Sequence, residues 1–220
     1  MGLHLATRST LYLAGSMVCA ATIVATFPAT VVGIETSSPV VKVVEDWELV
    51  IDSPDPDSGG PQVACVTSPV GNVDSLHLAF ELNHRTLPDY EIGGLQLQFW
   101  QGETVVAVAP ALGCSCLSYP DETIRWTQVL SLNNDGELTC GVGGASSESW
   151  GNFAADGRLS VTLDTPLENL NSYSPDVAVD ESGVSYAAHR VKSLVLKRVR
   201  YYLADGNVLE DDTDRVIHTH

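Results

Sequence analysis

The segment from Leu76 to Trp100 constrains the fold more than any other part of the sequence. Its first run, LHLAFELN, has leucine or phenylalanine at every second position, and so does its second run, LQLQFW, after a loop with Pro88 and the Gly93-Gly94 pair. A side-chain period of two is typical of a strand that buries one face and exposes the other. The segment therefore predicts two neighbouring strands of an antiparallel sheet.

The same alternation recurs along most of the chain. It continues around Trp47, around Trp126 and along Val191–Leu203, and the Asp135-Gly136 pair suits the positive φ of a tight hairpin turn. We expect about ten short strands and no helix in the folded part. The pattern predicts an all-β fold, a single antiparallel two-sheet β-sandwich of the jelly-roll type, over residues 41–210.

The first 29 residues have the order of a secretory signal peptide. Arg8 is the only charged side chain among the first ten residues, and an uncharged, mostly apolar run follows from Leu11 to Phe27. This order predicts that the protein is exported and that the segment is cleaved. The alternative is an uncleaved membrane anchor, although the apolar run is at the short end of the length needed to span a bilayer. We expect residues 30–40 to be a linker, residues 211–220 to be a flexible acidic and histidine-containing tail, and the protein to be secreted, periplasmic or held at the cell surface.

The charge balance is strongly acidic. The 220 residues contain 28 Asp and Glu against 11 Lys and Arg, so the formal net charge is −17. Phosphate backbones repel such a chain, which disfavours nucleic acid as a partner. Anionic membrane surfaces also repel it, so we expect membrane contact only if the N-terminal segment is uncleaved. The acidic side chains are interpreted as solubilising, with binding of divalent cations as the alternative.

Four cysteines remain after the expected cleavage, because Cys19 lies in the N-terminal apolar run. An even number of cysteines in an exported chain predicts disulfides. A bond inside the Cys114-Ser115-Cys116 motif would be strained, so the prediction pairs Cys65 and Cys140 each with one member of that motif. A four-thiolate zinc site is the alternative, although the usual two-residue spacers are missing.

An acidic loop interrupts the chain after the first strand. Ser53–Gln62 holds three prolines and a pair of glycines, so it cannot continue a strand. Asp52, Asp55 and Asp57 crowd this loop, and closely spaced carboxylates on a turn suit Ca²⁺. Their spacing matches no defined calcium motif. The loop is interpreted as a solvated acidic turn, with a structural calcium ion as the alternative.

Aromatic residues in polar surroundings are the candidate ligand-binding residues. Trp100 lies on the polar face of its strand, and Trp150, Phe153 and Tyr173 lie in polar segments. An exposed aromatic ring can stack on a sugar ring, whereas a buried one would close an end of the sandwich. These four residues are interpreted as a candidate polysaccharide site, with closure of the sandwich as the alternative.

The sequence shows no motif for catalysis. It has no G-x-S-x-G elbow, no H-E-x-x-H motif, no phosphate-binding loop and no dinucleotide fingerprint. A sandwich glycosidase would need two carboxylates facing each other across a cleft, and Glu81, on the polar face of its strand, is interpreted as solvated. No catalytic residue is assigned, and an enzyme is disfavoured.

The chain resembles two groups of proteins. Its alternating strands, which end in VKSLVLKRVRYYLADGNVL, resemble the jelly rolls of the concanavalin/laminin-G class and of carbohydrate-binding modules over most of residues 40–210. The stretches DWELVIDSPDPDSGGPQV, FELNHRTLPDYEIGGLQLQFW and RVKSLVLKRVRYY are similar to exported proteins of planctomycete-type bacteria, which implies export. We therefore predict an exported, non-catalytic module that binds polysaccharide or a cell-surface glycan. The alternatives are a structural or envelope-associated protein that binds protein partners and, after it, a glycoside hydrolase or lyase.

Overall fold

The computed structural model describes residues 38–54, 61–83, 94–113, 117, 119–148, 151–153 and 159–220. The described residues all belong to one compact unit, which lies within Val31–His220. The expected signal peptide and most of the expected linker lie outside the described residues. Among the residues described, no helix is long and apolar enough to cross a membrane.

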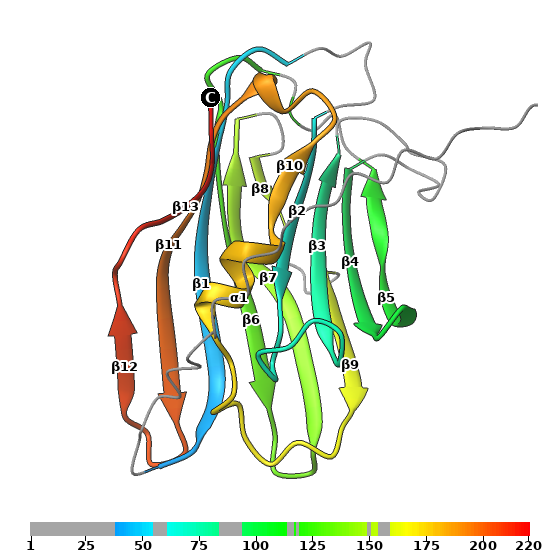
Figure 1. The fold of residues 1–220 in the computed structure, drawn as a ribbon, viewed down its shortest axis with the longest axis vertical. Helices are drawn as coiled ribbons and strands as arrows, with labels where there is room; N and C mark the ends of the chain where they lie inside the picture. Colours follow the sequence, from blue (N-terminus) through cyan, green and yellow to red (C-terminus); the bar gives the residue numbers. More distant parts are fainter. Residues whose placement is uncertain are drawn as a thin grey trace, which may run out of the picture. The chain divides into compact units, whose positions relative to one another are not determined.

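The described residues form two antiparallel sheets, which confirms the predicted all-β sandwich (Figure 1). Sheet A has eight strands, with β12-β11-β1-β6-β7-β8 in order, β13 paired with β11 and β9 paired with β7. They are β1 (Val40–Ile51), β6 (Thr123–Leu132), β7 (Glu137–Ser147), β8 (Gly151–Phe153), β9 (Ser160–Asp164), β11 (Val191–Leu203), β12 (Val208–Asp211) and β13 (Arg215–Thr219). Sheet B has five strands in the order β10 (Gly183–Ser185), β2 (Gln62–Thr67), β3 (His77–Asn83), β4 (Gly94–Gln101) and β5 (Thr104–Gly113).

The predicted strand pair of Leu76–Trp100 is confirmed as β3 and β4. Phe80 pairs with Leu97 and Leu78 with Phe99, and all four side chains are fully buried. The predicted hairpin turn is also present between β6 and β7. Gly136 has a φ of +82°, and a Cβ at this position would lie 2.8 Å from the carbonyl oxygen of Thr165, so the turn requires glycine.

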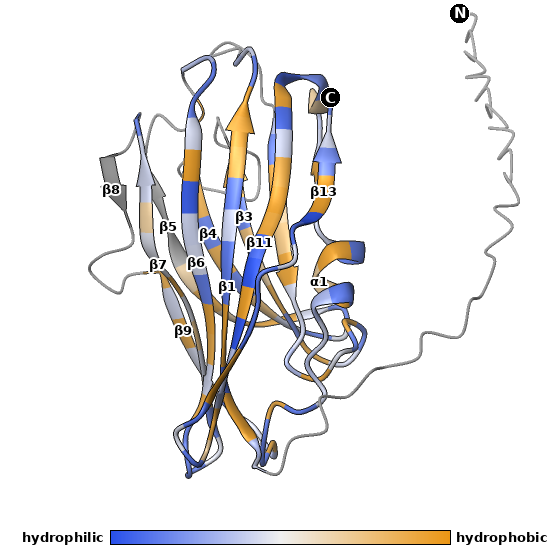
Figure 2. Ribbon diagram, turned by 90° about the vertical axis from the view of Figure 1, so that its left-hand side faces the viewer, coloured by the Kyte–Doolittle hydropathy of each residue, from blue (hydrophilic) through white to orange (hydrophobic). Residues whose placement is uncertain are grey.

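The core lies between the inner faces of the two sheets. Over most of β1 and β6, buried positions alternate with partly exposed ones, and Figure 2 shows both hydrophilic and hydrophobic bands along these strands. Each strand buries one tryptophan near its centre. Trp47 and Trp126 pair across the two strands, with parallel rings and centroids 6.1 Å apart. Phe80 of sheet B packs edge-on against Trp126 at 5.7 Å. These three aromatic rings therefore join the sheets.

Two expectations about regular structure are wrong. The region before β11 contains a helix, α1 (Pro175–Glu181), and a 3₁₀ turn, η1 (Ala188–Arg190). Residues 211–220 are not a flexible tail, because β13 pairs with β11 and Ile217 packs against the core. The acidic composition of this segment is typical of an exposed tail, so the sequence did not predict that it pairs with β11. Its carboxylates form ion pairs with Lys and Arg side chains, and Asp211 binds Arg215 at 2.5 Å.

The predicted disulfides of Cys65 and Cys140 are also wrong. Both residues are free and fully buried, Cys65 on β2 and Cys140 on β7. The alternation of each strand turns the thiol into the apolar core, away from solvent. The Cys114-Ser115-Cys116 motif lies outside the described residues. Burial, and then the charge of the nearby Glu45 carboxyl, raises the pKa of both thiols well above the ordinary 9.0.

We expect iodoacetamide to modify Cys65 and Cys140 only after the protein unfolds. The thiolate is the reactive form, and in the folded protein these two thiols are inaccessible and protonated at neutral pH. Peptide mapping after labelling under non-reducing conditions, with and without denaturant, measures this directly. A peptide containing either cysteine that is labelled in the native protein, or is joined to another by a disulfide, would contradict the expectation.

Candidate functional site

Three side chains from neighbouring strands form a row on the outer face of sheet B, here called the Trp100 row. Trp100 on β4 lies opposite His77 on β3 and opposite Val105 on β5. The alternation that buries Phe99 turns Trp100 outward, where it remains partly exposed. Val105 is 36% exposed. The row is therefore a strip of aromatic and apolar surface across three strands.

The indole of Trp100 is held in one orientation. Its ring is parallel to that of His77, with centroids 6.0 Å apart and an angle of 4° between the planes. His77 is fixed in turn, because its Nδ1 lies 2.7 Å from the carbonyl oxygen of Val73, which can only accept a hydrogen bond. On its other side Trp100 donates from Nε1 to Oε1 of Gln98 at 3.1 Å. A side chain that is already ordered loses little entropy when a ligand binds.

A second row lies beside the first, two residues along β3 and β4 and three along β5, where the pairing has a register shift. Gln98 lies opposite Ala79 on β3 and opposite Val108 on β5, which is 46% exposed. Gln98 donates from Nε2 to Oε1 of Gln96 at 2.5 Å, so its amide keeps one N–H and one carbonyl lone pair for another partner. Neither row contains Lys, Arg, Asp or Glu. The two rows together offer stacking surface and amide hydrogen-bonding groups without formal charge.

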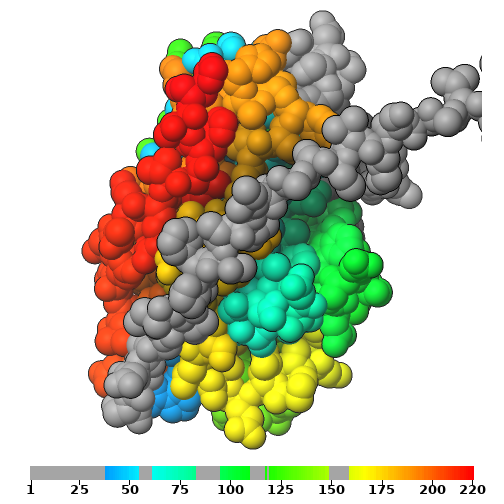
Figure 3. All heavy atoms as spheres, viewed as in Figure 1, coloured from blue at the N-terminus to red at the C-terminus, as the bar shows by residue number. Residues whose placement is uncertain are grey.

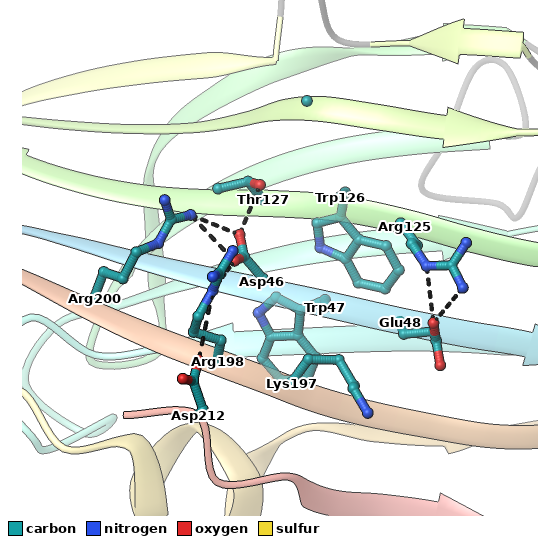
Figure 4. A pocket seen from close by; sticks show the side chains of 11 residues that line it. Asp46, Trp47, Glu48, Arg125, Trp126, Thr127, Lys197, Arg198, Arg200 and Asp212 are labelled. Carbon is teal, nitrogen blue, oxygen red and sulfur yellow. Dashed lines mark hydrogen bonds and ion pairs between the residues drawn. The ribbon is translucent and has the colours of Figure 1, made fainter. Parts of the chain in front are cut away.

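A groove of about 560 Å³ lies on the outer face of sheet A (Figure 4). Asp46 on β1 is at its centre. The carboxylate accepts hydrogen bonds from Oγ1 of Thr127 at 3.0 Å, from Nε of Arg198 at 2.7 Å and from Nη2 of Arg200 at 2.9 Å. These donors come from β6 and β11, so Asp46 ties both neighbouring strands to β1.

The other charged groups of this groove are paired as well. Arg125 binds Glu48 at 2.8 Å through Nε, and Lys197 binds Asp214 at 2.5 Å. Exposed ion pairs of this kind contribute little stability one by one, although a network across three strands fixes their relative positions. Because the charged groups bind one another, the groove is a weaker ligand-binding candidate than the Trp100 row.

A polar cluster is buried between the sheets around Glu45, which is 1% exposed. Its Oε2 accepts hydrogen bonds from Nε1 of Trp47 at 2.9 Å and from Oγ1 of Thr67 at 2.7 Å. Its Oε1 accepts one from the hydroxyl of Tyr173 at 2.7 Å. Gln128 donates to Oγ1 of Thr67 at 3.0 Å and approaches Glu45 at 3.4 Å. The cluster thus connects both sheets and the segment before α1.

Burial determines the electrostatics of this cluster. Loss of water raises the pKa of Glu45 above its ordinary 4.5, while the hydrogen bonds from Thr67, Tyr173 and Trp47 act in the opposite direction. The carboxyl is enclosed by protein groups and has no open face for a substrate. The sequence carried a signal for it, because Glu45 and Gln128 occupy the same strand faces as Trp47 and Trp126.

The four predicted ligand-binding aromatics have different outcomes. Trp100 lies partly exposed on an outer sheet face, as the prediction required. Tyr173 is only 3% exposed and its hydroxyl binds Glu45, so it belongs to the core and the prediction of an exposed stacking role is wrong for it. Phe153 ends β8, and its side chain is not described. Trp150 lies outside the described residues.

The predicted calcium loop is described only at its start. Asp52 lies 3.7 Å from Nζ of Lys192, which also binds Asp121. A calcium ion would have to compete with this ammonium group for Asp52. Asp55 and Asp57 lie outside the described residues, so calcium stays a prediction. Within the described ranges, no group of three or more His, Cys, Asp or Glu residues is placed to hold a metal ion.

Comparison with known proteins shows no family for this chain and only weak similarity to solved structures. No family model matches the chain, and no curated protein matches it. A crystal structure of scytalido-glutamic peptidase with a peptide-based transition state analog is 10% identical over 80% of this chain and 82% of that chain, with a TM-score of 0.34. A second structure of that peptidase, with a transition state analog inhibitor, is 11% identical over the same shares, with a TM-score of 0.28. Similarity this low transfers no activity.

Proposed function

We propose that this chain is an exported, non-catalytic module that binds polysaccharide through the outer face of sheet B. The observation that carries the proposal is the partly exposed Trp100, held parallel to His77 and fixed by its hydrogen bond to Gln98. A fixed indole offers a flat apolar surface on which the C–H face of a sugar ring packs, at little cost in side-chain entropy. Export rests on the N-terminal sequence.

The chemistry of the face favours a neutral polyhydroxylated chain. The Trp100 row supplies the stacking surface, and Gln98 in the second row supplies an amide that can both donate to and accept from hydroxyl groups. The rows are about 6.8 Å apart, because alternate residues on a strand are separated by two rises. A sugar stacked on the first row therefore has its edge hydroxyls within reach of the second. The absence of charged side chains from both rows fits a ligand without charge.

The valines of β5 favour a second candidate, a protein partner. Val105, Val106 and Val108 are 36%, 38% and 46% exposed, and β5 is the edge strand of sheet B. Contiguous exposed apolar residues mark many protein interaction sites. This candidate predicts binding that depends on the valines and not on the indole.

We expect Trp100→Ala to weaken polysaccharide binding at least about tenfold, because a central tryptophan in an interface contributes well over 1 kcal/mol. The mature protein is first screened on a polysaccharide array, with calcium and with a chelator. Titration calorimetry on the ligand that binds best then measures the dissociation constants of the wild type and the variant.

Tyr202→Ala is the matched control. Tyr202 is a partly exposed aromatic residue on the outer face of sheet A, where Lys42 lies 5.0 Å from its ring centroid. Its removal should leave polysaccharide binding unchanged. A Trp100→Ala protein that binds as tightly as the wild type would overturn the proposal. A protein that binds no polysaccharide, but loses a protein partner on Val108→Asp, would establish the second candidate instead.

A further inference from the structure

Another cavity, of about 340 Å³, lies at the side of sheet A opposite to β7 and β8. It is lined by the start of α1, by β11 and by the segment from β12 to β13. Figure 3 shows this C-terminal segment in red at the left of the view, across from the green residues of β5 at the right. The cavity is thus separate from the Trp100 row.

Two tyrosines form the floor of this cavity. Tyr173 and Tyr201 pack edge to face, with centroids 5.7 Å apart and an angle of 66° between the rings. Tyr173 directs its hydroxyl away, to Glu45. Tyr201 is only 6% exposed, lines the cavity, and has no hydrogen-bond partner for its hydroxyl among the described residues. This hydroxyl is not among the buried atoms that lack a partner, so it is accessible from the cavity, where a ligand atom can bind it.

The walls of the cavity carry an excess of negative charge. Among the described residues that line it are three carboxylates, of Asp176, Glu210 and Asp211, and one cation, Arg215. Arg215 is occupied by Asp211 at 2.5 Å, and Glu210 binds Arg198 at 2.8 Å. Asp176, in the first turn of α1, has no ion-pair partner among the described residues. An anionic ligand would be repelled here, and a cation would be attracted by Asp176 and by the tyrosine rings.

We propose that this cavity binds a small organic cation, an alkylammonium group, between Asp176 and the tyrosine floor. The carboxylate of Asp176 supplies the opposite charge. The rings of Tyr173 and Tyr201 supply the apolar surface that a strongly hydrated inorganic ion would not use. The free hydroxyl of Tyr201 accepts a hydrogen bond from an ammonium N–H.

Two cations of different chemistry test the proposal on the full-length protein. Tetramethylammonium has charge but no N–H donor, n-butylammonium has both, and 1-butanol is the neutral reference. Calorimetry or ligand-observed NMR at low ionic strength should show both cations binding more tightly than 1-butanol. Two cations that bind no better than 1-butanol would overturn the proposal.

Variants locate the binding in this cavity. Asp176→Asn should weaken both cations by about threefold or more, because it removes the unpaired charge. Tyr201→Phe keeps the ring and removes the hydroxyl, so it should weaken n-butylammonium about threefold and leave tetramethylammonium unchanged. Glu103→Gln, the same kind of charge change in the turn between β4 and β5, should alter neither. Thermal melts confirm that each variant is folded. Equal affinities in wild type and Asp176→Asn would overturn the assignment.

The ammonium group can belong to an amino sugar or to a lysine side chain. Glucosamine against N-acetylglucosamine, and lysine amide against norleucine amide, compare each source with a partner that lacks the charged amine. For each pair, the affinity of the compound with the charged amine is divided by that of its partner without it. The pair with the larger ratio identifies the source of the ammonium group. If neither ratio exceeds one, the proposal fails.

Discussion

Replacing Glu45 with alanine is expected to lower the free energy of unfolding by about 4 kcal/mol. The change removes the acceptor for Nε1 of Trp47, for Oγ1 of Thr67 and for the hydroxyl of Tyr173. Thr67 still accepts a hydrogen bond from Gln128, but its own O–H group loses its acceptor, as do the donors of Trp47 and Tyr173. Urea denaturation at pH 7 measures the loss. A decrease below about 1.5 kcal/mol would contradict this role for the carboxyl.

Glu45→Gln is the isosteric control, and it also tests the protonation of the cluster. An amide fills the same space, its carbonyl can accept from Trp47 and Thr67, and the hydroxyl of Tyr173 can rotate to accept from its N–H. We therefore expect a much smaller loss than for alanine, together with a changed dependence on pH.

The sign of that dependence follows from the raised pKa. Burial raises the pKa of Glu45 above 4.5, so the folded wild type holds this proton more tightly than the unfolded chain. The resulting stabilisation is complete below pH 4.5 and is lost as the pH rises through the folded-state value. The stability of Glu45→Gln relative to the wild type should therefore rise across this window and level off above it. A difference that does not change with pH would show that the carboxyl keeps its ordinary pKa.

The strand pattern was predictable wherever one face of a strand is buried. The period of two over Leu76–Trp100 gave β3 and β4 and placed Trp100 on the outer face. It failed for α1, because a helix of seven residues with one buried side chain, Ala178, has too few turns to show a helical period. It failed again for β13, because the acidic composition of residues 211–220 predicted a flexible tail where a short strand pairs with β11.

The buried cluster could be predicted only in part. Glu45 and Gln128 lie at inward positions of their strands, and a carboxyl on an apolar strand face requires nearby donors. Their partners could not be identified, because Tyr173 is 128 residues from Glu45 along the chain and lies in a segment without regular alternation. The cysteines show the converse error. The even number of cysteines and the expected export of the chain predicted disulfides. Cys65 and Cys140 instead occupy inward positions of their strands, which place their free thiols in the core.

Trp126→Ala is expected to lower the free energy of unfolding by about 4 kcal/mol, mainly through lost packing. The indole is 1% exposed, stacks on Trp47, contacts Phe80 of the other sheet edge-on and donates to Gln128 at 3.3 Å. Its removal leaves a cavity where the two sheets meet. Trp126→Phe, which keeps part of the volume, should lose about half as much.

Trp100→Ala is the matched comparison, because it removes the same side chain from the outer face of sheet B. The row it leaves is already in contact with solvent, so no closed cavity forms, and we expect a loss of about 1 kcal/mol or less. Urea denaturation followed by far-ultraviolet circular dichroism, which does not depend on tryptophan emission, measures both variants. Equal losses would mean that Trp100 supports the fold as Trp126 does, and weaker polysaccharide binding by Trp100→Ala would then reflect unfolding. If only Trp126→Ala lowers the free energy of unfolding strongly, Trp126 is the tryptophan that joins the two sheets, and Trp100 is available to bind a ligand.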